Sequence, residues 1–292
     1  MTSASPSSRL AVIGAGTMGS GIAYVAATAG HTVAVVEPDE TRRTDAAADL
    51  RATFDKAVAR GRVSVTEADA AYARLTFLAA IAEVADGLDL IVEAVPERLD
   101  LKRAVLAGAA AKNPRLLASN TSSIPIGSLA EGLPRPEDFL GLHFFNPVYA
   151  MPLLEIVTGA RTSSESHELA LAFAHSLGKD PISVADFPGF ATSRLGVALG
   201  LEAIRMLEDG VADAEDIDKA MVLGYRHPMG PLELTDVVGL DVRLDIARTL
   251  QAAYGDRFAP PKLLEDLVAA GKLGKKTREG FHHWTADGKR VR

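Results

Sequence analysis

The stretch LAVIGAGTMG, residues 10 to 19, decides the fold of the first half of this chain. It begins with a short apolar run, Leu10 to Ile13, which is typical of a buried strand. After the glycines, small and apolar residues continue at helical spacing through Ala29, and Gly30 ends them. The order therefore predicts a strand, a tight turn and a helix.

The three glycines of this stretch make the pattern G-x-G-x-x-G. In a dinucleotide site, Gly14 permits the turn, Gly16 lets the backbone approach a pyrophosphate, and Gly19 lets the helix pack closely. The anion rests on the helix N-terminus, beside Thr17 and Met18. The alternative is a glycine-rich turn without a function. The strand before the glycines and the helix after them favour the dinucleotide site.

A second strand, HTVAVVE at residues 31 to 37, ends in the carboxylate of Glu37. A carboxylate at this point accepts hydrogen bonds from both ribose hydroxyls and repels a 2′-phosphate, so the sequence predicts NAD rather than NADP. Arg42 and Arg43 keep NADP as a minority alternative. Their more ordinary role is the solvated face of a helix.

Strands and helices alternate along the first part of the chain. A long helix is expected at residues 41 to 60, further strands at 88 to 97 and 115 to 120, and a helix at 98 to 111. This alternation predicts an α/β fold, with a parallel sheet covered by helices on both faces.

The pattern changes near DFPGF, residues 186 to 190, after which no clear strand follows. Helices are expected at residues 190 to 209, 214 to 223, 239 to 254 and 261 to 270. We therefore predict a Rossmann-type NAD-binding domain over residues 1 to 187 and an all-helical C-terminal domain over residues 188 to 292. Residues 1 to 8, rich in serine, are expected to be a disordered lead-in.

Composition limits the possible partners. The 292 residues carry a net charge of −7 and a pI near 5.5, which argues against a nucleic-acid surface. The chain has no cysteine, so disulfides and thiolate metal sites are excluded, and we expect no metal. It has neither a leader-like start nor a run of about 18 apolar residues, so no membrane is expected and the cytoplasm is the expected location.

Two polar residues stand in apolar surroundings in GLHFFNPVYAMPLLEIV, residues 141 to 157. A dehydrogenase that oxidises an alcohol needs a base for the hydroxyl proton, and histidine titrates near neutral pH, so His143 is the candidate. If the segments on either side of PVYAMP are neighbouring strands, Glu155 can orient the imidazole. The alternative is two separately hydrogen-bonded polar groups in the core.

Seven motifs, in order, resemble the L-3-hydroxyacyl-CoA dehydrogenase family, in particular its monofunctional 3-hydroxybutyryl-CoA dehydrogenases. They are GAGTMG, IVEAVPE, SNTSS, HFFNPV-x-x-M-x-L-x-E, PGF-x-x-x-R, HPMGP followed by GLD, and GKKT-x-EGF. The resemblance extends from Leu10 to Trp284. It implies a dinucleotide-binding domain followed by a helical domain that forms a homodimer interface.

The resemblance implies reversible, NAD-dependent oxidation of a short L-3-hydroxyacyl-CoA to a 3-oxoacyl-CoA. His143 matches the catalytic base, Glu155 its partner, and Ser122 a serine near the 3-oxygen of the substrate. Positions beside the cofactor are matched by Glu97, Lys102, Asn120, Asn146 and Lys276, and contacts to coenzyme A by Thr53 and Arg60. The ordinary alternatives are turn residues, a surface ion pair between Glu97 and Lys102, and an exposed charged helix around Thr53.

Two positions depart from the family pattern. Ser193 stands where the family has an asparagine that helps to hold the reacting end of the substrate; serine keeps a donor and an acceptor but is shorter. Arg278 stands where glycine is common. Two other functions stay open. One is a related dehydrogenase of a small hydroxy acid such as L-gulonate, which is built on the same motifs. The other, which Ser193 admits, is a catalytically weak structural protein that binds NAD or acyl-CoA.

Overall fold

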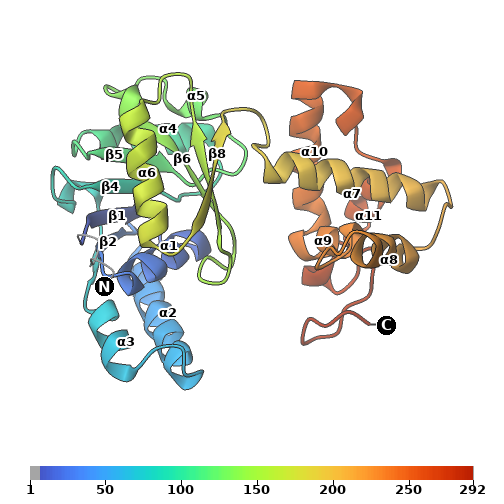
Figure 1. Ribbon diagram of the computed structural model, residues 1–292, viewed down its shortest axis with the longest axis horizontal. Helices are drawn as coiled ribbons and strands as arrows, with labels where there is room; N and C mark the ends of the chain where they lie inside the picture. The colour runs from blue at the N-terminus through green and yellow to red at the C-terminus, as the bar shows by residue number, and fades with distance from the viewer. Residues whose placement is uncertain (1–6, 292) are drawn as a thin grey trace. The chain divides into compact units, whose positions relative to one another are not determined.

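The computed structural model describes residues 7 to 291 (Figure 1). The chain divides into two compact units, one that ends at Phe187 and one that begins at Pro188. The expected disordered lead-in falls mostly on residues 1 to 6, outside the described part. Of its last two residues, Ser7 donates its hydroxyl to the carbonyl of Gly30, and Ser8 donates its N–H to Nδ1 of His31.

The first unit is built on one sheet of eight strands in the order β3-β2-β1-β4-β5-β6-β7-β8. The strands are β1 (Arg9–Ile13), β2 (Thr32–Val36), β3 (Leu75–Leu78), β4 (Leu90–Glu93), β5 (Leu116–Ser119), β6 (Phe139–Phe144), β7 (Leu153–Thr158) and β8 (Asp180–Ala185). All neighbouring strands are parallel except β6 and β7, which are antiparallel. The order reverses direction between β1 and β4, so a ligand crevice is expected outside their carboxyl ends.

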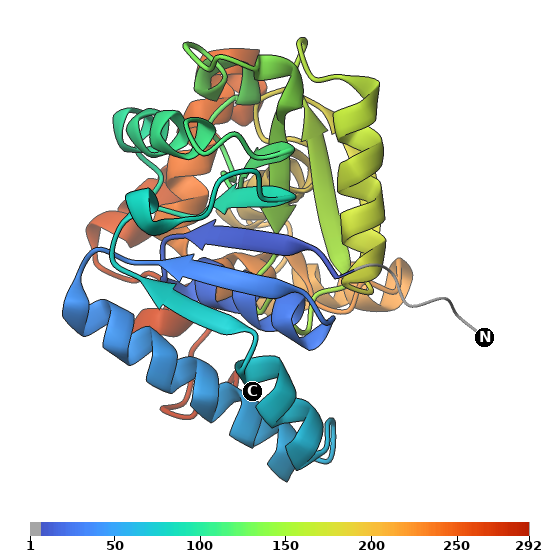
Figure 2. The same cartoon turned by 90° about the vertical axis from the view of Figure 1, so that its left-hand side faces the viewer.

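Helices cover both faces of this sheet (Figures 1 and 2). They are α1 (Thr17–Thr28), α2 (Glu40–Ala59), α3 (Val65–Tyr72), α4 (Leu99–Ala110), α5 (Ile126–Leu129) and α6 (Ser164–Ser176), with short 3₁₀ turns at Ile81–Glu83 and Pro136–Asp138. Because side chains alternate along a strand, Leu10 and Val12 join one core cluster with α1 and α6. The predicted α/β fold is confirmed.

The helices α2 and α3 form an antiparallel pair that extends away from the sheet (Figures 1 and 2). Phe54 of α2 is buried and packs against the rings of Tyr24 and Tyr72, at 4.6 and 6.2 Å between centroids. Ser64 starts α3 with a capping box, in which its side chain and that of Glu67 bond each other's backbone N–H. The sequence predicted α2 within one residue at each end, but α3 and β3 were not foreseen.

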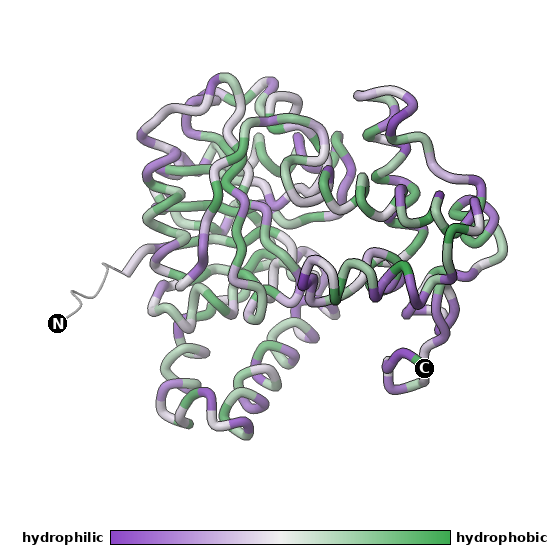
Figure 3. Tube along the Cα trace, turned by 45° about the vertical axis from the view of Figure 1, so that its right-hand side comes forward, coloured by the Kyte–Doolittle hydropathy of each residue, from purple (hydrophilic) through white to green (hydrophobic). Residues whose placement is uncertain are grey.

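The second unit is helical, as predicted. It consists of α7 (Thr192–Glu208), α8 (Ala214–Gly224), α9 (Pro231–Val238), α10 (Leu240–Tyr254) and α11 (Lys262–Ala269), with 3₁₀ turns at Asp256–Phe258 and Lys275–Thr277. Its core is aliphatic and includes Val197, Leu201 and Leu244. Figure 3 shows hydrophobic and hydrophilic residues alternating along these helices. Asp213 caps α8 by accepting a hydrogen bond of 2.8 Å from the N–H of Asp216.

Candidate active site

The glycine loop after β1 is shaped by contacts that exclude side chains. Gly14 has φ of +103°, and a Cβ there would lie 2.8 Å from the carbonyl oxygen of Ala94. A Cβ on Gly19 would lie 1.8 Å from the carbonyl oxygen of Gly14. Gly16 has an ordinary backbone conformation and nothing within 4 Å of such a Cβ. Gly14 and Gly19 thus serve the turn and the packing, while the backbone at Gly16, the N-cap of α1, is left open for an anion.

Glu37 lies over this loop, directly after β2, and is 8% exposed. One carboxylate oxygen accepts the N–H of Ala15 at 3.3 Å, and the other accepts that of Asp39 at 3.3 Å. Arg43 donates to the backbone carbonyl of Glu37 at 2.8 Å. The carboxylate is therefore fixed against the glycine loop, and Arg43 is bound to the backbone oxygens of Glu37 and Pro38.

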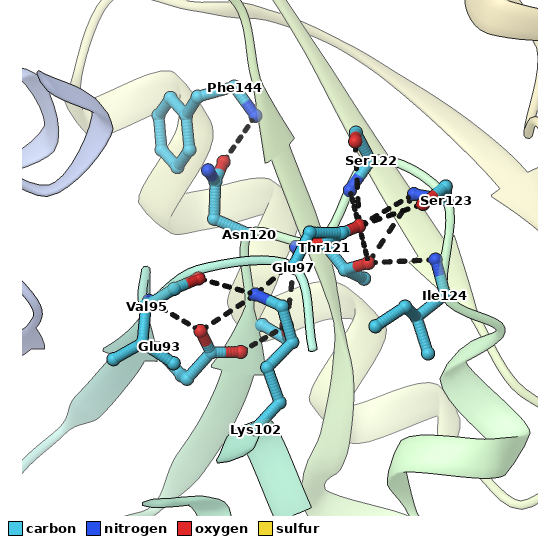
Figure 4. A network of polar contacts seen from close by, with 11 residues as sticks. Glu93, Val95, Glu97, Lys102, Asn120, Thr121, Ser122, Ser123, Ile124 and Phe144 are labelled. Atoms are coloured by element: carbon cyan, nitrogen blue, oxygen red, sulfur yellow. Dashed lines mark hydrogen bonds and ion pairs between the residues drawn. The ribbon is translucent and has the colours of Figure 1, made fainter. Parts of the chain in front are cut away.

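A polar network fills the carboxyl ends of β4 and β5 (Figure 4). Glu93, the last residue of β4, is 0% exposed and accepts three hydrogen bonds. They come from the N–H of Val95 at 2.6 Å, from Lys102 at 2.8 Å and from the hydroxyl of Ser119 at 2.6 Å. A buried carboxylate is tolerated only when it is paired in this way.

Lys102 of α4 is enclosed by this network, with a side chain that is 1% exposed. Its Nζ contacts Glu93, the carbonyl oxygen of Val95 at 3.0 Å and the carboxylate of Glu97 at 3.2 Å. A lysine has three donors, so all of them meet protein oxygens. The ion pair between Glu97 and Lys102 is therefore present, but its lysine is buried rather than at the surface.

Glu97 holds the loop that follows β5 (Figure 4). One of its oxygens accepts the hydroxyl of Thr121 at 2.6 Å and the N–H groups of Ser122 and Ser123 at 3.0 Å each. Burial alone would raise the pKa of Glu97, but the charge of Lys102 and these hydrogen bonds outweigh it, so the pKa lies below its ordinary value. Glu97 is thus an anion that fixes the backbone and places Ser122.

Asn120 connects the ends of β5 and β6. Its side-chain oxygen accepts the N–H of Phe144 at 2.9 Å (Figure 4). Phe144 directly follows His143 in β6. The loop that carries Ser122 and the strand that carries His143 are therefore fixed to each other.

His143 and Glu155 face each other across the antiparallel pair of β6 and β7. Nδ1 of His143 lies 2.7 Å from Oε2 of Glu155, and the two residues are 6% and 0% exposed. The ring of Phe145 packs on the imidazole, with centroids 4.4 Å apart. The two polar groups are thus not separate core residues but one hydrogen-bonded pair.

The connection between β6 and β7 is held down by Lys179, a residue that the sequence did not indicate. Lys179 is 8% exposed, and its Nζ donates to the carbonyl oxygens of Val148 and Met151, the second at 2.7 Å. Burial lowers its pKa. Val148 in turn packs so closely on α1 that a Cβ on Gly21 would lie 2.7 Å from it. These contacts fix the segment that contains Asn146.

Two cavities lie beside this connection. The smaller, of about 140 Å³, is lined by Thr17, Thr53 and Asn146 among others, so it joins residues that the family resemblance assigns to the cofactor and to coenzyme A. The larger, of about 490 Å³, shares Tyr24 and Tyr149 with it. The larger cavity is also lined by Arg62 and Lys179. Arg60 is exposed and is not among the residues that line either cavity.

The second unit holds two further expected residues, Ser193 and Lys276. Ser193 lies in the first turn of α7, where the neighbouring Arg194 stacks on Tyr254, 4.1 Å from the ring centroid, and donates to its hydroxyl at 3.3 Å. Lys276 forms an ion pair with both oxygens of Asp241 at 2.6 and 2.5 Å.

Family models match both units. One, described as the NAD binding domain of 3-hydroxyacyl-CoA dehydrogenase, covers residues 9–187, and one described as the C-terminal domain covers residues 189–284. This chain belongs to the 3-hydroxyacyl-CoA dehydrogenase family. The resemblance inferred from the seven motifs is thereby confirmed.

Relatives in this family match nearly the whole chain. A 3-hydroxybutyryl-CoA dehydrogenase of Mycobacterium tuberculosis is 42% identical over 279 residues, which cover 94% of this chain and 97% of that protein. A 3-hydroxyadipyl-CoA dehydrogenase of Escherichia coli is 39% identical over 282 residues, 95% of this chain and 59% of that protein. The solved structure of an (S)-3-hydroxybutyryl-CoA dehydrogenase from Ralstonia eutropha is 34% identical with a TM-score of 0.91, and covers 96% of this chain and 100% of that one.

Two family motifs of the C-terminal unit contain a glycine at a point where any side chain would collide with a buried aspartate. Gly230 of HPMGP leaves space for Asp218, which accepts the N–H groups of Leu232 and Glu233 at 2.8 and 2.9 Å. Gly280 of EGF leaves space for Asp236 in the same way, since a Cβ there would lie 2.1 Å from Oδ1 of Asp236. These glycines allow two buried aspartates to act: Asp218 holds the start of α9, and Asp236 holds the C-terminal segment by accepting the N–H groups of Phe281 and His282.

Sequence reasoning on this dehydrogenase missed Glu93, although the motif IVEAVPE contains it. Glu93 is a lone carboxylate inside an apolar run, and the same pattern pointed to Glu155. Ser119, its partner, gave no signal. In residues 7 to 291, none of the helices is both long and apolar enough to span a bilayer.

Proposed function

We propose that this protein catalyses the reversible, NAD-dependent oxidation of an L-3-hydroxyacyl-CoA to a 3-oxoacyl-CoA. The observation that carries the proposal is the hydrogen bond between His143 and Glu155. The strand that bears His143 belongs to the same sheet as β1, which ends in the dinucleotide loop.

The cofactor site that we propose fits NAD. The open backbone at Gly16 and the start of α1 suit the pyrophosphate, and Glu37 suits the ribose hydroxyls. Further contacts to the cofactor are proposed for Thr17 and Met18, which open α1, and for Asn146. Bound NAD would supply the acceptor for the hydride that leaves C3 of the substrate. The remaining chemistry belongs to residues of the chain.

His143 takes the proton of the 3-hydroxyl as the C–O bond becomes C=O. Because Nδ1 is held by Glu155, the proposal gives this transfer to Nε2. Glu155 fixes the orientation of the ring and stabilises the imidazolium, as the acid of a catalytic triad does. The hydride leaves C3 and the proton leaves oxygen, so the ketone forms with no other reactant. In the reverse direction, His143 returns the proton.

Ser122 positions the 3-oxygen in this proposal. Its place is set by Glu97, which accepts its N–H and lies 3.4 Å from its hydroxyl oxygen. Lys102 acts through Glu97 and Glu93, since its donors all meet protein oxygens. We therefore propose Lys102 as a positioning residue.

The coenzyme A end of the substrate is proposed to follow the two cavities. Thr53 lines the smaller cavity and Arg62 lines the larger. The guanidinium of Arg62 could therefore bind a phosphate group of coenzyme A in the larger cavity. Arg60, exposed at the end of α2, adds positive charge near the same place.

We also propose that the protein is a homodimer through its C-terminal unit. Leu234, Val237 and Val238 on α9 and Val242 on α10 are each 38% to 42% exposed. The three on α9 share one face of the helix, and such apolar patches mark interaction sites. Light scattering tests this: a dimer is expected, Val237→Asp should give a monomer, and a monomeric wild type would contradict the proposal.

The direct test of the activity is the consumption of NADH with acetoacetyl-CoA. The same thioester is assayed with NADPH, and the oxidation of free hydroxy acids such as L-gulonate is assayed with NAD. We expect turnover with the thioester and NADH. Preference for a free hydroxy acid would replace this function with the related dehydrogenase. Stabilisation of the protein by NAD without any turnover would indicate a structural protein that binds the cofactor.

A further inference from the structure

The larger cavity of the first unit, of about 490 Å³, is positively charged although the chain as a whole is acidic. Arg62 and Lys179 line it, and of the described residues that line it none is an aspartate or a glutamate. The rings of Tyr24 and Tyr149 belong to the same wall. Sites for small molecules usually enclose about 300 to 1,000 Å³. The cavity therefore has the size and the charge for an anion that also carries a ring system.

Lys179 is a buried cation with a donor to spare. It is 8% exposed, and its Nζ donates to the carbonyl oxygens of Val148 and Met151. A protonated lysine has three donors, so one remains for a ligand in the cavity that Lys179 lines. Burial lowers its pKa, and within residues 7 to 291 no carboxylate offsets that effect. An anion bound beside Lys179 would stabilise its charge.

Arg62 brings a second cation to the cavity. It is exposed and lies three residues beyond the end of α2. Burial raises the pKa of Tyr24, and the charge of Arg62 acts in the opposite direction. The guanidinium is therefore close enough to act on the phenol of Tyr24. Because guanidinium and ammonium groups both form charge-assisted hydrogen bonds with phosphate oxygens, Arg62 and Lys179 together suit a phosphate group.

Tyr149 supplies an aromatic surface at the same place. It is 47% exposed, although its ring meets that of Tyr24 edge-on, with centroids 6.1 Å apart and planes at 71°. A ring that is partly held by protein and partly open can stack on a nucleotide base, because every base has a π-face. The cavity thus combines a stacking surface with two cations.

The two cavities beside the connection between β6 and β7 follow one another. Asn146, three residues after His143, lines the smaller, and both cavities share Tyr24 and Tyr149. A ligand that extends from the smaller cavity into the larger therefore passes Tyr149 before it reaches Lys179. Coenzyme A has a matching order of groups, with the thiol end first, then the pantetheine arm, and last an adenosine that bears a 3′-phosphate.

We propose that the larger cavity binds the adenosine end of coenzyme A, with Arg62 and Lys179 for the 3′-phosphate and Tyr149 for the adenine. The protein then selects thioesters of coenzyme A over thioesters of a bare phosphopantetheine arm, such as a carrier protein presents. This inference rests on the proposed function, which fixes only that the substrate is a coenzyme A thioester.

The first test uses the unchanged protein. kcat/KM with NADH is measured for acetoacetyl-CoA and for acetoacetyl-3′-dephospho-CoA, which differ only in the 3′-phosphate. We expect a preference of about tenfold or more for acetoacetyl-CoA, because hydrogen bonds between charged groups are among the stronger ones. Equal values for the two thioesters would overturn the inference.

The second test removes the cations. Arg62→Met and Lys179→Met should each lower this preference about threefold to tenfold. Lys179 also holds the connection between β6 and β7, but damage to that connection lowers kcat/KM for both thioesters alike, whereas loss of a phosphate contact lowers it only for acetoacetyl-CoA. If Lys179→Met does not fold, the wild type and Arg62→Met decide.

The control for the cations is Arg115→Met. Arg115 is exposed like Arg62 and is paired with Glu165, and it lines neither cavity. This variant should leave the preference unchanged. A preference that stays at the wild-type value in Arg62→Met, or that falls as far in Arg115→Met, would overturn the assignment of the phosphate.

The third test concerns the adenine. Acetoacetyl-3′-dephospho-CoA is compared with acetoacetyl-4′-phosphopantetheine, which lacks the adenosine monophosphate unit. Tyr149→Ala should lower the ratio of their kcat/KM values about fivefold or more, since stacking on a base is lost, while Tyr149→Phe keeps the ring and should keep the ratio. An unchanged ratio in Tyr149→Ala would remove Tyr149 from the adenine site.

Binding gives a readout that does not depend on turnover. Titration calorimetry compares free coenzyme A with 3′-dephospho-coenzyme A while NAD fills the dinucleotide site. We expect coenzyme A to bind about tenfold more tightly, and Arg62→Met to remove most of this difference. Equal binding would overturn the inference. Equal turnover of the three thioesters removes this inference alone, whereas no turnover of any of them removes the proposed function.

Discussion

Lys102 and Glu93 form a buried ion pair, with 2.8 Å between Nζ and Oε1 and side chains that are 1% and 0% exposed. Removing one partner of such a pair leaves the other charge buried and uncompensated. We expect Lys102→Met to lower the free energy of unfolding by about 3 to 5 kcal/mol, as measured by urea titration.

The control for this change is Lys112→Met, which removes a pair to the exposed Asp86 at 3.5 Å. That variant should lose less than about 1 kcal/mol. Equal effects of the two variants would show that the network around Glu93 does not support the site as described.

Glu97 predicts a pH dependence of stability. Its pKa in the folded protein lies below the ordinary value of 4.5, so its contribution is fully present above about pH 4.5 and is lost as pH falls through the folded pKa. The difference in unfolding free energy between the wild type and Glu97→Gln should therefore shrink on acidification from pH 7. Urea titrations at several pH values measure it, and a difference that grows at acidic pH would contradict the assignment.

Glu37 should govern cofactor choice. We expect Glu37→Ala to weaken NAD binding about tenfold to hundredfold, because a charged acceptor for the ribose hydroxyls is lost, while NADP binding changes less. Titration calorimetry with both cofactors measures the effect, with Glu40→Ala, in the exposed first turn of α2, as the control. An unchanged NAD affinity would remove Glu37 from the ribose site.

Arg278 carries strain at a position where the family commonly has glycine. Its φ of +65° is in the left-handed region, which costs a residue with a side chain about 1 to 2 kcal/mol. Glycine is free there but loses more entropy on folding, so Arg278→Gly should raise the unfolding free energy by about 0.5 to 1 kcal/mol. Thermal unfolding checks this. Arg248→Gly, inside α10, should instead lose about 1 kcal/mol, and a loss in both would refute the account of strain.

Much of this architecture was predictable because the sequence patterns are strong. The glycine loop, the alternation of strands and helices, and the long helices of the second unit follow from periodicity and from turn residues. The α3 helix, VTEADAAY, is short and exposed on most sides, and α9, PLELTDVV, begins with the last residue of HPMGP, so neither stood out. Both depend on tertiary packing rather than on their own pattern.

The candidate site was predictable where a polar residue interrupts an apolar run, as at His143 and Glu155. The supporting contacts were not, because they join segments far apart in the sequence. Glu93 and Ser119 meet across neighbouring strands, and Lys179 reaches back to Val148.

The measurement that tests the account most directly is kcat of His143→Ala for the reduction of acetoacetyl-CoA by NADH, taken together with the affinity of the variant for NADH. We expect kcat to fall by about 10² to 10⁴ or more, since the proton transfer loses its acid and base, while the affinity stays near that of the wild type. A kcat close to the wild-type value, or a loss of NADH binding as the reason for inactivity, would contradict the assignment of His143 as the catalytic base.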